Sequence, residues 1–300
     1  MDWITGIQNA INYIEDHITE ELDYAQIARE SFSSPFHFQR VFSILCGYTL
    51  GEYIRSRRLT LAGQELASTR EKVIDVACKY GYDSPESFAK AFQKFHGITP
   101  TQARGGGAML KSFSRLSIKV SLEGGSIMNY RIEEKNAFLL TGYKRRFTGS
   151  PNDKQEQDHN FACESRLEQA ILEGLCREHE TIYQVLTNFD AEGYDFYFAY
   201  QFPNWALKDL EDLPEDIQAR FSNVNVPAGQ YLVCETERCQ FPTAKMDELR
   251  RKAVSEWLPT SGYELRDAPE IGVIHWFWEE GNEKLNHSRY CELWLPIVKK

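Results

Sequence analysis

Residues 34–47 read SPFHFQRVFSILCG, and residues 84–97 read SPESFAKAFQKFHG. Both stretches begin with Ser-Pro, carry phenylalanine at the fifth and ninth positions and end on glycine. Serine is a good helix cap, and proline costs nothing at the first helical position, where its missing N–H has no partner in any case. The chain is therefore predicted to form the same short helix twice.

On a helix, the residues that the two copies share fall on one face. At about 100° per residue, that face is apolar in both copies and the opposite face changes between them. The apolar faces are Phe38, Val41, Phe42 and Leu45, and Phe88, Ala91, Phe92 and Phe95. The opposite faces are Phe36, Gln39, Arg40 and Ser43, and Glu86, Ala89, Lys90 and Gln93. A constant buried face with a variable outer face is typical of one scaffold directed at two targets.

A shorter helical segment precedes each copy, at residues 22–31 and 72–82. Helix, tight turn and helix thus occur twice, and in helix-turn-helix proteins the second helix of each pair lies in the major groove of DNA. The connecting residues 49–68 can form a helix of about 18 residues, roughly 27 Å long. Such a rod would hold two readers about one DNA turn apart, which is about 34 Å. Twin amphipathic helices also occur in ordinary bundles, which is the alternative interpretation.

Residues 7–104 resemble the DNA-binding domain of the AraC/XylS family of bacterial transcription regulators. The likeness is carried by Ile27-Ala28, Ser34–Phe42, Gly47-Tyr48-Thr49, Tyr53–Leu59, Ile74–Ala77 and Gly81–Pro100. The resemblance implies a monomeric double helix-turn-helix that reads two adjacent major-groove segments. The residues that it places at DNA are Phe36, His37, Gln39, Arg40, Ser43, Glu86, Ser87 and Lys90. Arg40 has the chemistry to pair with guanine, Gln39 with adenine and Glu86 with cytosine.

Composition and charge agree with a chain of two domains. The 300 residues are 42% hydrophobic, no run approaches the length of a membrane span, and the seven cysteines contain no C-x-x-C motif. We therefore expect a soluble, cytoplasmic protein with reduced thiols. Of the net charge of −10, residues 1–104 contribute 11 basic and 13 acidic residues and the rest 23 and 31, so most of the excess acid lies in the second part. Local nucleic-acid binding is allowed.

The Gly-Gly-Gly run at residues 105–107 predicts a flexible boundary. We expect an all-α DNA-binding domain over 1–104, a linker and leading strand over 105–126, and an α+β domain with an antiparallel sheet over 127–300. The predicted order in the α+β domain is β-β-α-β followed by β-α-β-β, as in two related halves. A long helix over 164–189 and a helix over 243–259 capped by Thr243 are part of that prediction.

Alternation along the last strand separates two faces. Tyr290, Glu292 and Trp294 point to one side, so that a carboxylate is flanked by two aromatic rings. Further large rings follow in the same domain, at Trp276, Trp278, Tyr231, Trp205 and Tyr143. Aromatic walls around one anionic group suit an organic cation. A solvated glutamate on an edge strand, with its neighbours in an ordinary core, is the alternative.

Residues 127–300 resemble the GyrI-like effector-binding domain. The motifs are Gly229–Tyr231, Glu256–Pro259 with Ser261–Glu264, and Glu292–Ile297. The resemblance implies a groove between two pseudo-symmetric halves, with Glu292 in contact with cationic or bulky hydrophobic compounds. The stretch 147–165 matches no motif and is interpreted as a solvated insertion or a loop over the groove.

Together, the two resemblances imply a transcription regulator that binds promoter or operator DNA under the control of a small-molecule effector, without a cofactor or metal. They leave RNA polymerase open as a further partner. Three alternatives remain at this stage. One is a hydrolase that uses Glu292 with Tyr231 or Tyr290, another is a metal site at Cys176, His179 and Glu180, and the last is a protein-binding module.

Overall fold

The computed structural model describes residues 3–105, 107–118, 128–177 and 180–300. The chain forms two compact units, Met1–Gln39 with Tyr48–Glu123, and Arg40–Gly47 with Gly124–Lys300. The short segment Arg40–Gly47 thus groups with the C-terminal residues, although it lies within a helix of the predicted DNA-binding domain. The limits predicted from sequence, at 104 and 126, stay a prediction.

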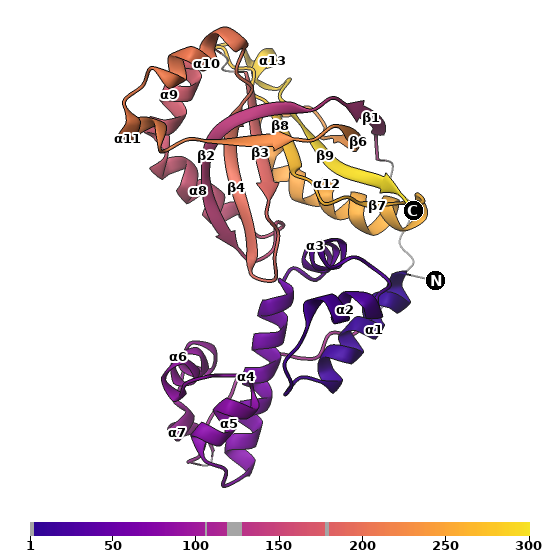
Figure 1. The fold of residues 1–300 in the computed structure, drawn as a ribbon, viewed down its shortest axis with the longest axis vertical. Helices are drawn as coiled ribbons and strands as arrows, with labels where there is room; N and C mark the ends of the chain where they lie inside the picture. Colours follow the sequence, from indigo (N-terminus) through magenta and orange to yellow (C-terminus); the bar gives the residue numbers. More distant parts are fainter. Residues whose placement is uncertain (1–2, 106, 119–127, 178–179) are drawn as a thin grey trace. The chain divides into compact units, whose positions relative to one another are not determined.

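The first unit is helical, as predicted (Figure 1). Its helices are α1 (Trp3–Asp16), α2 (Tyr24–Glu30), the start of α3 (Pro35–Cys46), α4 (Leu50–Ser68), α5 (Val73–Lys79), α6 (Pro85–His96) and α7 (Pro100–Ala103). The α4 rod begins with a capping box, in which Thr49 and Glu52 satisfy each other's backbone N–H groups. The two helix pairs and the rod between them are therefore confirmed.

The second repeat packs through the face expected from its sequence. Phe88 and Phe92 of α6 are fully buried, together with Leu66 of α4 and Val76 of α5. The Ser84 hydroxyl accepts a hydrogen bond from the Ser87 N–H (3.1 Å) and caps the helix. At the other end, Gly97 takes a left-handed conformation with φ of 81° that favours glycine.

Arg57 of α4 joins three parts of the first unit. Its guanidinium donates twice to the Glu15 carboxylate of α1, at 2.8 Å each, and once to the Phe113 carbonyl at 2.6 Å. The Phe113 N–H in turn donates to the Thr60 hydroxyl (2.9 Å). Residues 110–118 therefore lie along the helices as an extended segment, and the strand predicted to begin there is not formed; residues 119–127 lie outside the described residues.

The second unit is built on a curled antiparallel sheet, as predicted (Figure 1). Its strands are β1 (Tyr130–Lys135), β2 (Phe138–Thr148), β3 (Thr181–Thr187), β4 (Gly193–Tyr200), β5 (Ser222–Val226), β6 (Gly229–Glu235), β7 (Tyr263–Leu265), β8 (Glu270–His275) and β9 (Tyr290–Lys299). They lie in the order β1-β6-β9-β8-β3-β4-β2-β5, and β7 pairs with β9. The described residues also form α8 (Gln155–Glu164), α9 (Arg166–Cys176), α10 (Asn204–Glu211), α11 (Glu215–Gln218), α12 (Met246–Lys252) and α13 (Glu283–Asn286).

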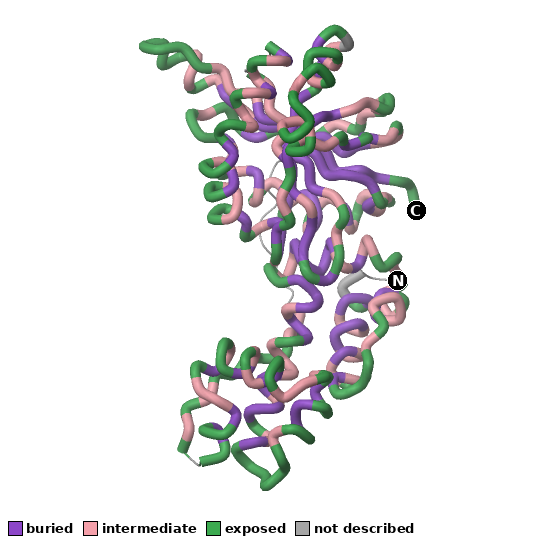
Figure 2. Tube along the Cα trace, turned by 60° about the vertical axis from the view of Figure 1, so that its left-hand side comes forward, coloured by how far each residue is buried: buried purple, intermediate pink, exposed green. Residues whose placement is uncertain are grey.

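Two similar halves meet at the pairing of β3 with β8. One half runs β2, α8 and α9, β3, β4, and the other runs β6, α12, β8, β9. One face of the sheet packs against α8 and α9 through Phe161 and Leu172. On the other face, the ring of Phe138 from β2 lies 6.3 Å from that of Trp294, although three strands separate β2 from β9 in the sheet. The sheet therefore curls around this second face, and its strands are largely buried (Figure 2).

Three expectations for this unit were wrong in detail. The helix predicted over 164–189 ends at Cys176, and Thr181–Thr187 forms β3, because a short apolar run fits a buried strand as well as a helix. Thr243 does not cap α12 but lies in a 3-10 turn, Pro242–Lys245, ahead of it. Residues 147–165 are not a plain solvated insertion, since Gln155–Glu164 forms α8 and buries Phe161.

We expect Phe92→Ala to lower the free energy of unfolding of the helical unit by about 3–5 kcal/mol, because it removes a fully buried ring and leaves a cavity. Gln93→Ala, at the exposed neighbouring position, should change it by less than about 0.5 kcal/mol. Urea unfolding of the full chain, followed by far-ultraviolet circular dichroism, measures both. Equal midpoints for the two variants would overturn the assignment of the buried face.

Candidate functional site

The eight residues predicted at DNA lie in different environments. On α6, Glu86, Ser87 and Lys90 are exposed. On α3, Phe36, His37 and Gln39 are half-buried. Arg40 and Ser43 were expected on an outer face but are buried, with 1% and 7% of their surface exposed. Amphipathic periodicity could not reveal this, because residues distant in the sequence cover the polar side of α3.

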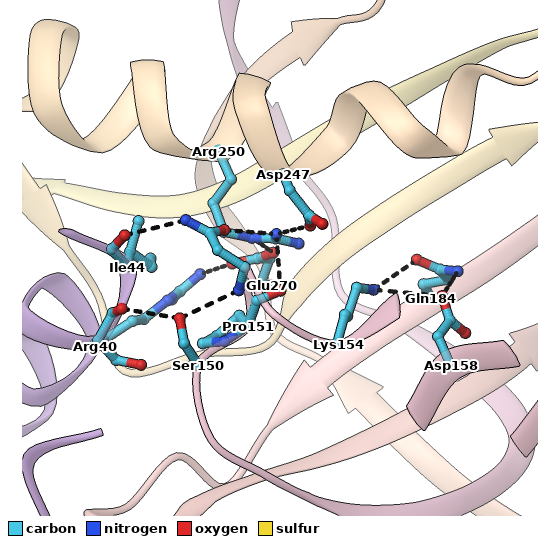
Figure 3. A network of polar contacts seen from close by, with 12 residues as sticks. Arg40, Ile44, Ser150, Pro151, Lys154, Asp158, Gln184, Asp247, Arg250 and Glu270 are labelled. Carbon is cyan, nitrogen blue, oxygen red and sulfur yellow. Dashed lines mark hydrogen bonds and ion pairs between the residues drawn. The ribbon is translucent and has the colours of Figure 1, made fainter. Parts of the chain in front are cut away.

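Arg40 belongs to a buried group of charges that we call the ion cluster, formed by Arg40, Asp247, Arg250 and Glu270 (Figure 3). One carboxylate oxygen of Glu270, Oε2, accepts from Arg40 Nη2 at 2.6 Å. The other, Oε1, accepts from Arg250 Nε at 2.6 Å. Arg250 Nη1 also donates to Asp247 Oδ1 at 2.7 Å. Two positive and two negative groups thus alternate through the cluster.

Burial and pairing act in opposite directions on these groups. Burial lowers the pKa of Arg40, against the raising effect of Glu270. Burial alone would raise the pKa of Glu270, but Arg250 and Arg40 together bring it below its ordinary value. Glu270 therefore stays ionised without any exposed surface, because arginine charge lies beside it.

The loop before α8 holds the same segment of α3 through its backbone. Ser150 Oγ donates to the Ser43 carbonyl at 2.8 Å, and Asn152 Nδ2 donates to the Ile44 carbonyl at 3.1 Å (Figure 3). The Ile44 carbonyl lies in the last turn of the helix, where carbonyls lack intrahelical partners, whereas the Ser43 carbonyl also accepts from the Gly47 N–H at 3.0 Å. Asn152 also accepts from Arg250 Nη1 at 3.1 Å, which connects the loop to the ion cluster.

A pocket of about 530 Å³ lies on the helix-covered face of the sheet. Its walls come from both halves, with α8 on one side and the Pro242–Lys245 turn and α12 on the other. The lining residues are Tyr143, Lys154, Gln155, Asp158, His159, Ala162, Gln169, Ile182, Gln184, Phe198, Tyr200, Thr243, Ala244, Met246, Asp247, Ile274 and Trp276. Its volume falls within the range of small-molecule sites, and we call it the effector pocket.

Three polar side chains meet in the effector pocket. Lys154 Nζ donates to Gln184 Oε1 at 3.0 Å, and Gln184 Nε2 donates to Asp158 Oδ2 at 3.3 Å (Figure 3). The second carboxylate oxygen of Asp158, Oδ1, is buried and accepts no hydrogen bond from the described residues. Burial raises the pKa of Asp158 and lowers that of Lys154. The pocket thus contains an acceptor that a bound donor or cation could satisfy.

The eight residues predicted at the ligand do not form one site. Tyr143 and Trp276 line the effector pocket. Glu292, Trp294 and Tyr231 lie on the opposite face, where Trp294 and Tyr231 belong to the core enclosed by the curled sheet. The rest are dispersed: Tyr290 stacks on His275, and Trp205 and Trp278 are 51% and 63% exposed. Strand alternation gave the faces correctly but could not tell which face carries the pocket.

Glu292 is already paired on both carboxylate oxygens. Oε1 accepts from Arg131 Nη2 at 2.7 Å, and Oε2 accepts from the Trp294 indole N–H at 2.7 Å. The Tyr231 hydroxyl donates to the Pro227 carbonyl at 3.1 Å. The geometry therefore does not support the hydrolase alternative, which needs Glu292 beside a tyrosine hydroxyl as an available base.

Among the described residues, no group of three histidine, cysteine, aspartate or glutamate side chains is placed to hold a metal ion. Of the trio considered from the sequence, Cys176 is buried, and His179 lies outside the described residues.

Sequence reasoning missed Lys154, Asp158 and Gln184. The first two were assigned to a polar surface stretch, although Lys154, Asp158 and Phe161 recur at the spacing of one helix face. Phe161 was the available signal, because a phenylalanine in such a stretch favours an amphipathic helix. Gln184 was hidden within the incorrectly predicted long helix.

Each part of the chain matches a family model and known proteins. A family model described as a helix-turn-helix domain matches residues 27–106, and one described as an integron-associated effector binding protein matches residues 131–297. The transcriptional activator AarP of Providencia stuartii is 44% identical over 98 residues, which are 33% of this chain and 73% of AarP. The regulatory protein SoxS of Salmonella typhimurium is 39% identical over 98 residues, covering 33% of this chain and 92% of SoxS. The structure of SAV2435 bound to tetraphenylphosphonium aligns with 57% of this chain and 94% of its own, at 17% identity and a TM-score of 0.39.

These observations define a class: a DNA-binding transcription regulator of the AraC type with a GyrI-like effector-binding domain, controlled by a ligand. The chain belongs to the family of integron-associated effector binding proteins, whose model covers more than half of its length. Of the two relatives, AarP is a transcriptional activator and SoxS is a regulatory protein. In the part of the chain that the structure describes, no helix has both the length and the apolar character needed to cross a bilayer.

We expect Arg250→Ala to destabilise the second unit by about 3–5 kcal/mol, because it removes one partner of a buried ion pair and leaves charge uncompensated. Arg251→Ala, on the same helix but exposed, is the matched control and should have little effect. Urea unfolding followed by tryptophan fluorescence gives the comparison. A loss below about 1 kcal/mol for Arg250→Ala would show that the cluster contributes little to the fold.

Proposed function

We propose that this chain binds specific duplex DNA through α3 and α6, and that a cationic molecule with aromatic or amphipathic character, bound in the effector pocket, controls that binding. The observation that carries the proposal is the Asp158 carboxylate, whose buried Oδ1 has no hydrogen-bond partner among the described residues in a pocket with aromatic walls. Burying such an oxygen costs free energy unless a bound group donates a hydrogen bond to it or pairs with its charge.

The charges and rings of the pocket favour a cation. Asp158 and Asp247 contribute two carboxylates, against the single ammonium of Lys154, whose pKa is lowered by burial. The rings of Tyr143 and Trp276 also line the pocket, and the Trp276 ring already attracts one cation of the chain, the Arg289 guanidinium at 4.1 Å from its centre. A neutral aromatic molecule gains the same apolar contacts without the attraction to the carboxylates.

The opposite face of the sheet is a weaker candidate for the same role. Arg131 is bound to Glu292, and Lys135 Nζ lies 4.0 Å from the centre of the Trp294 ring. Two side chains of the chain itself thus occupy the positions that a cationic ligand would take. A ligand at Glu292 would first have to displace them, whereas Asp158 Oδ1 has no hydrogen-bond partner in the part of the chain that the structure describes.

On the DNA side, the exposed N-terminal part of α6 supports readout by Glu86, Ser87 and Lys90. In the first helix-turn-helix, the residues that we assign to DNA contact lie on α3: Phe36, His37, Gln39, Arg40 and Ser43. Contact with RNA polymerase stays a prediction.

We expect Asp158→Asn to weaken the binding of tetraphenylphosphonium about five- to a hundredfold, because the substitution keeps the shape of the side chain and removes its charge. Binding of the neutral triphenylphosphine oxide should change little. Isothermal titration calorimetry with both compounds gives the comparison. Equal losses for the two would mean that Asp158 supports the shape of the pocket rather than a charge contact.

Two controls locate the site and its charge. Glu292→Gln should leave both affinities unchanged, and a selective loss of the cation there would move the site to the other face of the sheet.

A bound cation favours the ionised form of Asp158, whose pKa is raised by burial. The affinity of the wild-type chain for tetraphenylphosphonium should therefore rise with pH as the Asp158 carboxyl ionises. Asp158→Asn should lose this part of the rise and keep any part that comes from His159 or Lys154.

We expect Lys90→Ala to weaken DNA binding and to lower the slope of log affinity against log salt by about one if Lys90 contacts a phosphate. Lys284→Ala removes the same charge from an exposed position in the second unit and serves as the control. Fluorescence anisotropy at several salt concentrations, with a duplex that the wild-type chain selects from a random-sequence pool, measures both. Identical curves for Lys90→Ala and wild type would place Lys90 outside the DNA interface.

A further inference from the structure

The ion cluster connects the effector pocket to a residue proposed to read DNA. Asp247 lines the pocket and accepts from Arg250. Arg250 and Arg40 each donate to one oxygen of Glu270. A continuous series of charge-assisted contacts therefore runs from the pocket wall to Arg40, all of it within the second unit.

The contact with Glu270 excludes DNA reading by Arg40. The Arg40 guanidinium is buried, at 2.6 Å from Glu270 Oε2, and lies against the Phe189 ring at 4.9 Å from its centre. A guanidinium reads guanine through two parallel hydrogen bonds to the base edge, and those donors must be exposed. The Arg40 guanidinium can thus pair with Glu270 or with a DNA base, but not with both at once.

Arg250 has an additional donor with which it could replace Arg40 at Glu270. Its Nε already binds Oε1, and its Nη2 is buried without a hydrogen-bond partner in the described residues. Nε and Nη2 form the pair of donors with which arginine binds a carboxylate on both oxygens. Nη1 donates to Asp247 at 2.7 Å, to Asn152 Oδ1 at 3.1 Å and to the Pro151 carbonyl at 3.3 Å, and the contact with Asp247 is the shortest of the three that hold the guanidinium in place.

We infer that Glu270 is the regulatory partner of Arg40 and that a cation in the effector pocket releases Arg40 for DNA. A bound cation attracts the Asp247 carboxylate and weakens its hold on Arg250. Arg250 then takes both oxygens of Glu270, so that the buried carboxylate remains neutralised while Arg40 leaves. This inference rests on the proposed function, and it assigns a direction to the control: the cationic effector strengthens specific DNA binding.

The loop that binds the end of α3 adds to the same restraint. Ser150 and Asn152 hold the carbonyls of Ser43 and Ile44, and Asn152 also accepts from Arg250. A shift of Arg250 therefore affects the loop as well as Glu270. Release of residues 40–47 then proceeds as one step. By linkage, specific DNA should strengthen effector binding by the same factor as the effector strengthens DNA binding.

The test compares DNA affinities of ligand-free proteins at one salt concentration. Glu270→Gln keeps the shape of the side chain but leaves Arg40 buried without its counter-charge beside Arg250, which retains only Asp247, and this favours departure of Arg40. We expect it to bind the selected duplex about 5- to 150-fold more tightly than wild type, and to lose the further increase that tetraphenylphosphonium gives the wild type. Glu280→Gln, an exposed carboxylate, is the matched control and should behave as wild type.

A second variant decides the matter if Glu270→Gln does not fold. Asn152→Ala, at a half-buried position, removes the hydrogen bond to the Ile44 carbonyl and should raise ligand-free DNA affinity in the same direction by a smaller factor. Unchanged or weaker DNA binding by a folded Glu270→Gln, or by Asn152→Ala when Glu270→Gln does not fold, would overturn the inference. If wild type then still responds to the cation, the proposed function survives. If neither wild type nor variant selects a duplex, the proposed function fails first.

Discussion

A carboxylate without exposed surface requires positive charge around it, and Glu270 imposes that requirement on the second unit. It lies at the start of β8, the strand through which one half of the sheet meets the other. Arg250 brings α12 onto the sheet, and Arg40 brings the end of α3 to the same place. The sheet, one wall of the pocket and the C-terminal part of α3 are thus fixed by one ionised group.

The pocket follows from the duplication within this unit. Because β3 and β8 pair in the middle of the sheet, the helices of the two halves lie on one face with a space between them. Gly272 of β8 provides part of this arrangement, since a Cβ there would approach Met246 Cε of α12 to 2.4 Å. A side chain at this position would displace the flexible end of Met246, which lines the pocket.

The two faces of the sheet differ in how their buried carboxylates are hydrogen-bonded. At Glu292, the chain itself provides the partners, Arg131 and the Trp294 indole. At Asp158, the described residues provide a hydrogen-bond partner for one oxygen and none for the other. A face whose buried carboxylate is fully hydrogen-bonded by the chain itself is suited to stability. A face whose buried carboxylate has an unpaired oxygen is suited to binding a ligand. This difference, more than the number of aromatic rings, distinguishes the candidate binding face.

The sequence by itself determined the two helix pairs, the rod between them and the alternating strands, because those features depend on local spacing, caps and apolar periodicity. Phe88, Phe92 and Ser84 take the places that their spacing predicted. Tertiary structure decided the rest. Arg40 is buried beside Glu270, 230 residues away in the chain, and Asp158, unlike Glu292, has an oxygen that no described residue hydrogen-bonds; both depend on which distant side chains meet. Periodicity gives the face of a helix or strand, but the partner of a buried charge is set only when the chain has folded.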